Sequence, residues 1–339
     1  MKKVVLLATG GTIASAEHED GRSKAGALPG EVLARQIQLH DDITLDVKSV
    51  FQKPSNAITL FDQHYLRQQC QALIDSGEVD GIVITHGTDT LEETAYFLDT
   101  TLKTGDVTVV VTGSQRVPHA MGTDAFVNLQ DAVHVAASPQ TRGLGVTVVF
   151  NEMIYSAAHV RKVSSFQING FDAPALGCLG IIDNGVVTVY QRPVRLPIIT
   201  PASVSAGAKA DGATPSLPVV DIVNVYLDAR PALLQAAIDS GAQGIVIDGI
   251  GRGHVPPAWM DAIRSAIDRG VIVLICSSTL HGPVYQTYEF QGSLHDLESA
   301  GAIGISGLTA RKARIRLIAL LGSQKQVSTD TVKAAFSAA

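Results

Sequence analysis

Residues 4–15 read VVLLATGGTIAS and join a short apolar run to two glycines and two threonines. A run of this length that is bounded by glycine is typical of a buried strand, here Val4–Ala8. In an open parallel sheet, the turn after such a strand faces the ligand crevice at the carboxyl ends of the strands. Glycines let the backbone turn sharply, and Thr12 offers a hydroxyl that can attack a carbonyl carbon. A plain turn in which Thr12 bonds its own backbone fits this segment equally well.

The same pattern continues along the chain, because β-branched runs alternate with amphipathic stretches as in βαβ units around a parallel sheet. We therefore predict a doubly wound, mostly parallel α/β domain over residues 1–190. Its predicted strands are Val4–Ala8, Thr44–Val50, Gly81–Thr85, Val107–Thr112 and Gly145–Phe150, and its predicted helices are Leu60–Asp75, Leu91–Thr101 and Ala125–Ala136; after residues 186–190 the chain becomes irregular.

A second domain is expected because 339 residues exceed what one hydrophobic core usually organises, about 250–300 residues. Prolines surround a segment of small residues without periodicity, which predicts a linker over 191–218. Beyond it the alternation resumes, so residues 219–339 are predicted to form a smaller α/β domain. Its predicted elements are the strands Val219–Val225, Gly244–Asp248 and Val271–Cys276 and the helices Ala232–Ser240, Ala258–Arg269 and Thr309–Leu321.

Composition argues against several classes of protein. The net charge of −6 and the lack of a long basic block disfavour a nucleic-acid partner. The apolar runs fall far below the roughly 18 residues that a membrane span needs. Three widely separated cysteines indicate neither a disulfide framework nor a zinc site. The apolar run after Lys2 and Lys3 is too short for a signal peptide, so we expect a cytoplasmic protein.

A second motif, ITHGTDT at residues 84–90, again follows a predicted strand and precedes a predicted helix. It should open onto the same sheet edge as Thr12. Asp89 can accept a substrate ammonium there, and Thr88 can position a water or relay a proton. The spacing from Asp89 to Glu92 also fits a helix capping box, in which Asp89 is simply the helix cap.

Together, TGGTIAS at 9–15 and HGTDT at 86–90 resemble the two signature motifs of the bacterial-type asparaginase and glutaminase family. TGSQR at 112–116 resembles a third family block, and RKARI at 311–315 resembles the family's last helix. The motifs are long and in the family's order, and the resemblance covers essentially all 339 residues. It implies hydrolysis of the side-chain amide of L-asparagine, and also of L-glutamine, with Thr12 as the nucleophile of an acyl-enzyme.

The resemblance also implies partners and roles. No metal or organic cofactor is implied, the ligands are L-asparagine or L-aspartate, and we expect a homotetramer built from dimers. Thr88, Asp89 and a lysine correspond to the family's second catalytic cluster. Ser55 and Asp89 correspond to the positions for the substrate α-carboxylate and α-amino group, and Ser114 to a backbone carbonyl that meets the amide. The predicted substrate-binding residues are Gly11, Ser55, Asn56, Gly87, Asp89, Ser114 and Glu289.

The lysine can be aligned in two ways. Matching Lys162 makes Lys-Val-Ser-Ser resemble the family's Lys-Thr-Asn-Thr at the cost of a short insertion, whereas the ungapped register places Ser165 there. We favour Lys162, because a lysine paired with Asp89 can hold Thr88 in place.

The family's loop after the first threonine normally carries a tyrosine that helps to activate the nucleophile, yet residues 13–64 contain none. The loop over 13–30 is predicted to be a lid, or an ordinary surface loop. The residue that activates Thr12 stays open, with Tyr285, Tyr288 and Glu289 as candidates.

Three alternatives remain beside the amidohydrolase. GIGRGH at 249–254 suggests a dinucleotide site but has His254 where the last glycine is needed; in the family this turn reaches a neighbouring subunit's site, through Arg252 or His254. A non-catalytic amino-acid-binding protein would keep the crevice without turnover. The glutaminase component of a tRNA-dependent amidotransferase is also similar, but carries an N-terminal domain that we do not expect here.

Overall fold

The computed structural model describes the chain except residues 18–22, 25, 202–216, 325 and 338–339, so most of the predicted linker lies outside the described residues. The chain divides into two compact units, Met1–Val194 and Arg195–Ala339. No helix within the described ranges is long and apolar enough to cross a membrane.

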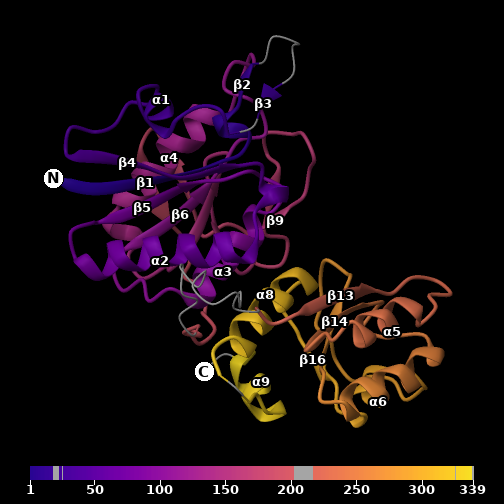
Figure 1. The fold of residues 1–339 in the computed structure, drawn as a ribbon. Helices are drawn as coiled ribbons and strands as arrows, with labels where there is room; N and C mark the ends of the chain where they lie inside the picture. The colour runs from indigo at the N-terminus through magenta and orange to yellow at the C-terminus, as the bar shows by residue number, and fades with distance from the viewer. Residues whose placement is uncertain (18–22, 25, 202–216, 325, 338–339) are drawn as a thin grey trace, which may run out of the picture. The chain divides into compact units, whose positions relative to one another are not determined.

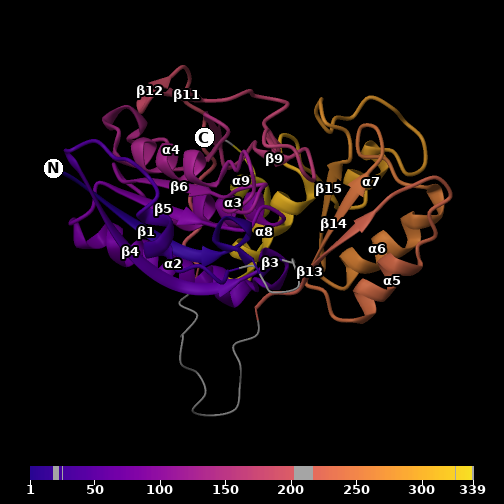
Figure 2. The same ribbon diagram turned by 90° about the horizontal axis from the view of Figure 1, so that it is seen from above.

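The first unit is built on an eight-stranded, mostly parallel sheet, which confirms the predicted fold class. The strand order is β12-β11-β8-β7-β6-β5-β1-β4, and the labels in Figure 2 follow it from β12 to β4. The parallel strands are β1 (Lys2–Gly10), β4 (Ile43–Lys53), β5 (Gly81–Thr85), β6 (Thr108–Thr112) and β7 (Val146–Phe150). The antiparallel extension is β8 (Met153–Ser156), β11 (Gly180–Asp183) and β12 (Val186–Val189).

Helices cover both faces of this sheet (Figure 1): α1 (Gly30–Ala34) and α4 (Ala125–Ala137) lie on one face, and α2 (Leu60–Ser76) and α3 (Leu91–Thr101) on the other. Burial of apolar residues on both faces explains why the central strands are continuous runs of β-branched residues. Two short hairpins lie outside the sheet, β2 (Ala16–Glu17) with β3 (Ser23–Lys24) and β9 (Arg161–Lys162) with β10 (Phe171–Asp172). Single 3₁₀ turns are η1 (Thr12–Ala14), η2 (Ser55–Ala57) and η3 (Pro139–Thr141).

The second unit is smaller and consists of a four-stranded parallel sheet with helices packed on it. Figure 2 shows α8 on one side of this sheet and α5 and α6 on the other. Trp259 and Met260 are fully buried in its core. The elements are β13 (Val220–Asn224), α5 (Ala232–Asp239), β14 (Gly244–Gly249), η4 (Pro257–Trp259), α6 (Met260–Asp268), β15 (Ile272–Ser277), α7 (Leu294–Ser299), β16 (Ile303–Gly304), α8 (Ala310–Leu321) and α9 (Thr329–Ala335).

The register of the first sheet brings three turns to one level. Strand β1 pairs in parallel with β4 and β5, so that Ala8 lies opposite Thr85 and Gly10 opposite Lys53. The chain therefore leaves these three neighbouring strands at the same carboxyl edge. The two predicted motifs follow β1 and β5, so both lie at this edge.

Candidate active site

The turns after β1, β4 and β5 are pressed against one another, because two glycines lack the Cβ that would hold them apart. A Cβ on Gly11 would lie 2.3 Å from the backbone nitrogen of Gly87, and a Cβ on Gly87 would lie 2.9 Å from Ser55 Oγ. Gly11 has φ of 83°, a left-handed conformation that favours glycine. The Gly11 amide donates to the Lys53 carbonyl at 3.2 Å. Gly11, Gly87 and Ser55, all predicted site residues, therefore meet at one point.

Thr12 follows Gly11 directly and begins the 3₁₀ turn η1. Its side chain is half-buried, whereas Ile13 behind it is fully buried in the core that includes α1 and α4. Thr9, at the end of β1, donates its hydroxyl to the Thr85 carbonyl at 2.7 Å and ties the two motif-bearing strands together. The Thr12 turn is therefore held by the Thr9 hydrogen bond before it and by the buried Ile13 after it. Thr12 itself lies at the rim of the packed turns.

Lys162 joins Thr88 and Asp89 in one hydrogen-bonded cluster. Its Nζ donates to Thr88 Oγ1 and to Asp89 Oδ1, each at 2.7 Å. The side chain of Lys162 is 18% exposed and that of Asp89 is 70% exposed, so the cluster has one buried end and one end open to solvent. Thr88 itself is buried. Of the two residues considered for the lysine position, Lys162 makes these contacts, and Ser165 is exposed on the segment beyond it.

The capping-box alternative for Asp89 is wrong. Helix α3 begins at Leu91 with Thr90 as its N-cap, and the cap makes no side-chain hydrogen bond to the helix. The Thr90 hydroxyl instead donates to the Ser55 carbonyl at 2.9 Å. Asp89 is left facing Lys162, since the helix start lies one residue further along than the capping pattern predicted.

Glu92 was not among the predicted site residues, yet it contacts the cluster through the backbone of Lys162. Its carboxylate is buried on the first turn of α3 and accepts the backbone N–H of Lys162 at 2.7 Å. Hydrogen bonds to a charged acceptor are stronger than neutral ones. Glu92 therefore fixes the backbone from which the Lys162 side chain reaches Thr88. The only signal for it in the sequence was the capping-box spacing, which pointed to another partner.

His86 anchors the second motif from inside. Its ring is fully buried, and burial lowers its pKa from the usual value near 6.5 to about 4, so the ring is neutral at neutral pH. Nδ1 lies 2.8 Å from the Gly87 carbonyl, which can only accept, so Nδ1 carries the proton and donates. The turn that leads into Thr88 and Asp89 is thereby held at its first residue.

The segment TGSQR at 112–116 packs beside the turn that contains His86. Gly113 packs against His86, because a Cβ at Gly113 would lie 2.5 Å from the His86 carbonyl oxygen. Ser114 is fully buried and donates its hydroxyl to the Arg116 carbonyl at 2.6 Å. Asp124 accepts the backbone N–H groups of Gln115 and Arg116 at 2.9 Å each. The Ser114 backbone is therefore fixed beside the His86 turn.

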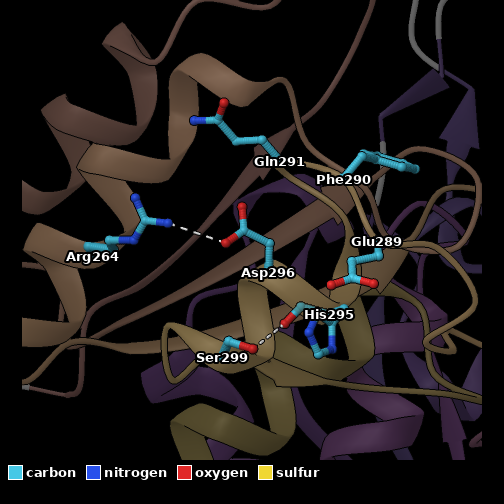
Figure 3. A pocket seen from close by; sticks show the side chains of 7 residues that line it. All are labelled: Arg264, Glu289, Phe290, Gln291, His295, Asp296 and Ser299. Carbon is cyan, nitrogen blue, oxygen red and sulfur yellow. Dashed lines mark hydrogen bonds and ion pairs between the residues drawn. The ribbon is translucent and has the colours of Figure 1, made fainter.

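Two predicted site residues are not brought into this cluster. Asn56 lies next to Ser55 on η2 but is exposed. Glu289 belongs to the second unit, where it lines an open pocket of about 410 Å³ beside the ion pair of Arg264 with Asp296 (Figure 3). Tyr285 and Tyr288, the other candidates for activating Thr12, are exposed in the second unit. Part of the predicted lid over 13–30 lies outside the described residues.

The cluster brings together side chains of three chemical kinds. Within the described part of the chain, no group of three or more histidine, cysteine or carboxylate side chains is arranged to hold a metal ion. The side chains that do meet are hydroxyls, one ammonium and one carboxylate, which are groups for nucleophilic attack and proton handling.

Comparison with known proteins identifies the class to which this fold and cluster belong. Residues 3–195 match the family model described as "Asparaginase, N-terminal", and residues 219–336 match the "Glutaminase/Asparaginase C-terminal domain". The chain belongs to the asparaginase family, as the sequence motifs indicated.

Relatives match along nearly the whole chain. The L-asparaginase of Bacillus licheniformis is 45% identical over 97% of this chain and 98% of its own length. A glutaminase-asparaginase of Pseudomonas aeruginosa is 34% identical over 81% of this chain and 75% of its own length. Among solved structures, a probable cytoplasmic L-asparaginase from Campylobacter jejuni superimposes with a TM-score of 0.84 at 30% identity, covering 99% of both chains.

Proposed function

We propose that the chain is an L-asparaginase, which hydrolyses the side-chain amide of L-asparagine to L-aspartate and ammonia. The Thr12 oxygen attacks the amide carbon, and the tetrahedral intermediate expels the amide nitrogen. The hydroxyl proton ends on that nitrogen, which leaves as ammonia, and an aspartyl ester of Thr12 remains. Water then adds to the ester carbonyl, so that L-aspartate is released and the threonine hydroxyl is restored.

The observation that carries this proposal is the cluster of Lys162 with Thr88 and Asp89, next to the glycine turn that bears Thr12. In the proposed mechanism Lys162 orients the Thr88 hydroxyl, which positions water and relays a proton. The exposed part of the Asp89 carboxylate accepts the substrate α-ammonium. No step requires a metal or an organic cofactor.

Substrate binding is proposed to use the packed turns. The Gly87 backbone N–H and the Ser55 hydroxyl bind the α-carboxylate and the developing oxyanion, since fixed amides stabilise such charge. Gly11, whose own N–H bonds to the Lys53 carbonyl, lines the same point through its backbone. The Ser114 carbonyl meets the amide group. Asn56, next to Ser55, completes the proposed set at the rim of the packed turns. Glu289 stays a prediction from the family resemblance.

Glutamine is proposed as a weaker substrate, because the family includes an enzyme named for both amides. One methylene of side-chain length changes binding in a pocket by only about 1–3 kcal/mol. We therefore expect hydrolysis of both amides, with a lower rate for L-glutamine. We further propose a cytoplasmic homotetramer, by analogy with the solved relative's cytoplasmic description for the location and by the family resemblance for the assembly.

The test is ammonia release from L-asparagine and, separately, from L-glutamine by the purified chain. We expect saturable release from L-asparagine, and a loss of at least about 10³-fold in kcat for Thr12→Ala with binding of L-aspartate retained. Thr12→Ser, which keeps a hydroxyl, is the control and should retain part of the activity. Saturable binding of L-asparagine without any turnover would instead identify a non-catalytic amino-acid-binding protein.

A further inference from the structure

A separate cavity of about 190 Å³ lies in the first unit at the end of β1 opposite to Thr12. It is lined by Lys2 at the start of β1, by His40 and Asp42 just before β4, by His134 in the last turn of α4, and by Gly185 in the β11–β12 hairpin. Strand β1 has 9 residues, so this cavity lies roughly 25 Å from the Thr12 turn at about 3.3 Å per residue. It is therefore not part of the proposed active site.

His134 is the unusual residue in this cavity. Its side chain is only 5% exposed, yet neither ring nitrogen has a hydrogen-bond partner among the residues that the structure describes. Buried polar side-chain atoms nearly always have a partner, so two such atoms in one ring that lines a cavity indicate an occupant. No sequence motif includes His134.

His40 brings a second imidazole to the same place. The two ring centroids are 4.6 Å apart with an interplanar angle of 33°. A Cβ on Gly185 would lie 2.8 Å from His40 Nε2 and 3.2 Å from His134 Cε1, so both ring edges converge on the glycine. With metal–nitrogen bonds of about 2.0–2.1 Å at 90–110° to each other, two imidazole centroids lie about 4.5–5.2 Å apart. The observed spacing matches two rings on one ion.

The charges around the cavity favour a cation, because the Lys2 ammonium that also lines it is paired with Asp80 at 4.0 Å. Asp42 lines the cavity and acts on His134 by its negative charge. The carboxyl end of α4 adds the partial negative charge of a helix C-terminus. Burial, and then the neighbouring His40, lower the pKa of His134, so its ring is neutral at neutral pH with a free lone pair. Neutral imidazole is a preferred ligand of late first-row transition metals.

We propose that His40 and His134 bind one divalent transition metal ion of the Zn²⁺ type. No third side chain in the described part of the chain is already in place as a ligand, so water fills the remaining positions, and Asp42 reaches the ion after rotating its side chain. The metal takes no part in amide hydrolysis. It joins the segment just before β4 to the end of α4, and so stabilises the first unit.

The first experiment compares thermal unfolding of chelator-treated protein with Zn²⁺ and with Mg²⁺ at pH 7.5. Zn²⁺ at about 100 times its Kd should raise Tm by roughly 5–10 °C, because it binds only the folded chain. Mg²⁺, which prefers oxygen ligands, should leave Tm unchanged. Equal Tm values with and without Zn²⁺ would overturn the proposal and indicate that the cavity holds water only.

Two variants locate the site. His134→Leu removes both unpartnered nitrogens, and His40→Ala changes an exposed side chain that the fold does not need. Each should abolish the Zn²⁺-dependent rise in Tm and reduce the calorimetric stoichiometry from one ion to none. His281→Ala, an exposed histidine of the second unit, is the matched control and should keep both. A rise that persists in His40→Ala would contradict the proposal even if His134→Leu failed to fold.

Discussion

The carboxyl edges of the two sheets differ although the strands that end at each edge are parallel in both. In the first unit the turns after β1, β4 and β5 press together, and Ser55, His86 and Thr88 are buried among them. In the second unit the turn after β14 is open, and Ile250, Gly251 and Arg252 are exposed. A Cβ on Gly251 would meet only the His254 ring, at 3.7 Å.

The difference shows that a parallel sheet supplies a position for a site but not the site itself. Parallel strands bring their turns to one edge in both units. In the first unit glycines let the turns of neighbouring strands touch through their backbones, so that polar side chains from different turns are fixed relative to one another. In the second unit the close contact after β14, between Gly249 and Gly253, lies within a single turn. The proposed chemistry depends on this packing, and four predictions test it.

The largest effect should come from Lys162→Met, which removes the ammonium but keeps much of the apolar chain. We expect kcat to fall about 10²–10³-fold, in the range seen for loss of a proton-handling group. Tm should change little, because Asp89 is 70% exposed and is hydrated when its partner is lost. Steady-state kinetics and thermal unfolding of the same preparation check both statements. An unchanged kcat would show that Lys162 does not contribute to catalysis.

Lowering the pH should reduce the free energy of unfolding, because His86 is buried in its neutral form. Its pKa is about 4 in the folded chain against about 6.5 when unfolded, so the unfolded state binds more protons between these values. Stability from this residue is complete above pH 6.5 and is lost as the pH falls toward 4, by about 3 kcal/mol in all. Denaturant unfolding at pH 7.5, 6 and 5 measures the slope.

His86→Asn is the control for this pH effect. Asparagine can keep a donor for the Gly87 carbonyl but does not titrate, so the dependence of unfolding free energy on pH should flatten. His64, whose pKa burial also lowers to about 4, keeps a share of the slope in both proteins. The same slope in wild type and variant would show that His86 does not titrate as its burial implies.

A matched pair of glycine substitutions compares the two edges directly. Gly11→Ala combines φ of 83° with a Cβ 2.3 Å from a backbone nitrogen, so we expect about 2–4 kcal/mol of destabilisation and loss of activity. Gly251→Ala has φ of 55° and no close contact, so the left-handed conformation alone should cost about 1–2 kcal/mol. Denaturant unfolding gives both values, and equal costs would remove the proposed difference between the edges.

The smallest effect should come from Glu92, which acts through Lys162 rather than on substrate. Glu92→Gln keeps an acceptor for the Lys162 N–H and should lower kcat less than about 10-fold. Glu92→Ala removes the acceptor and should lower kcat further, with KM nearly unchanged because no substrate contact is lost. A rise in KM without a change in kcat would mean that Glu92 shapes binding instead.

Much of the fold could be predicted from the sequence where patterns are strong. The predicted ranges Gly81–Thr85 and Leu91–Thr101 are those of β5 and α3, because a fully apolar run and a clear helical period leave little choice. The antiparallel strands β8 and β11 were not predicted. They have 4 residues each, too few for a period to stand out.

The site could be predicted only in part, for a physical reason. Thr88 and Asp89 belong to a local motif, but their contact with Lys162 spans more than 70 residues of chain. The same holds for Glu92, whose spacing from Asp89 suggested a helix cap although its partner lies 70 residues away. Local patterns show which residue types are present, whereas tertiary packing decides which of them meet.

Thr12 is the proposed nucleophile, and mass spectrometry of an acid-quenched reaction with L-asparagine can detect its acyl-enzyme. Slow hydrolysis of the ester in Lys162→Met should let the acyl-enzyme accumulate. We predict one aspartyl group, mapped by peptide digestion to Thr12 and absent from Thr12→Ala. An adduct on Thr88, or full turnover by Thr12→Ala, would show that Thr12 is not the nucleophile.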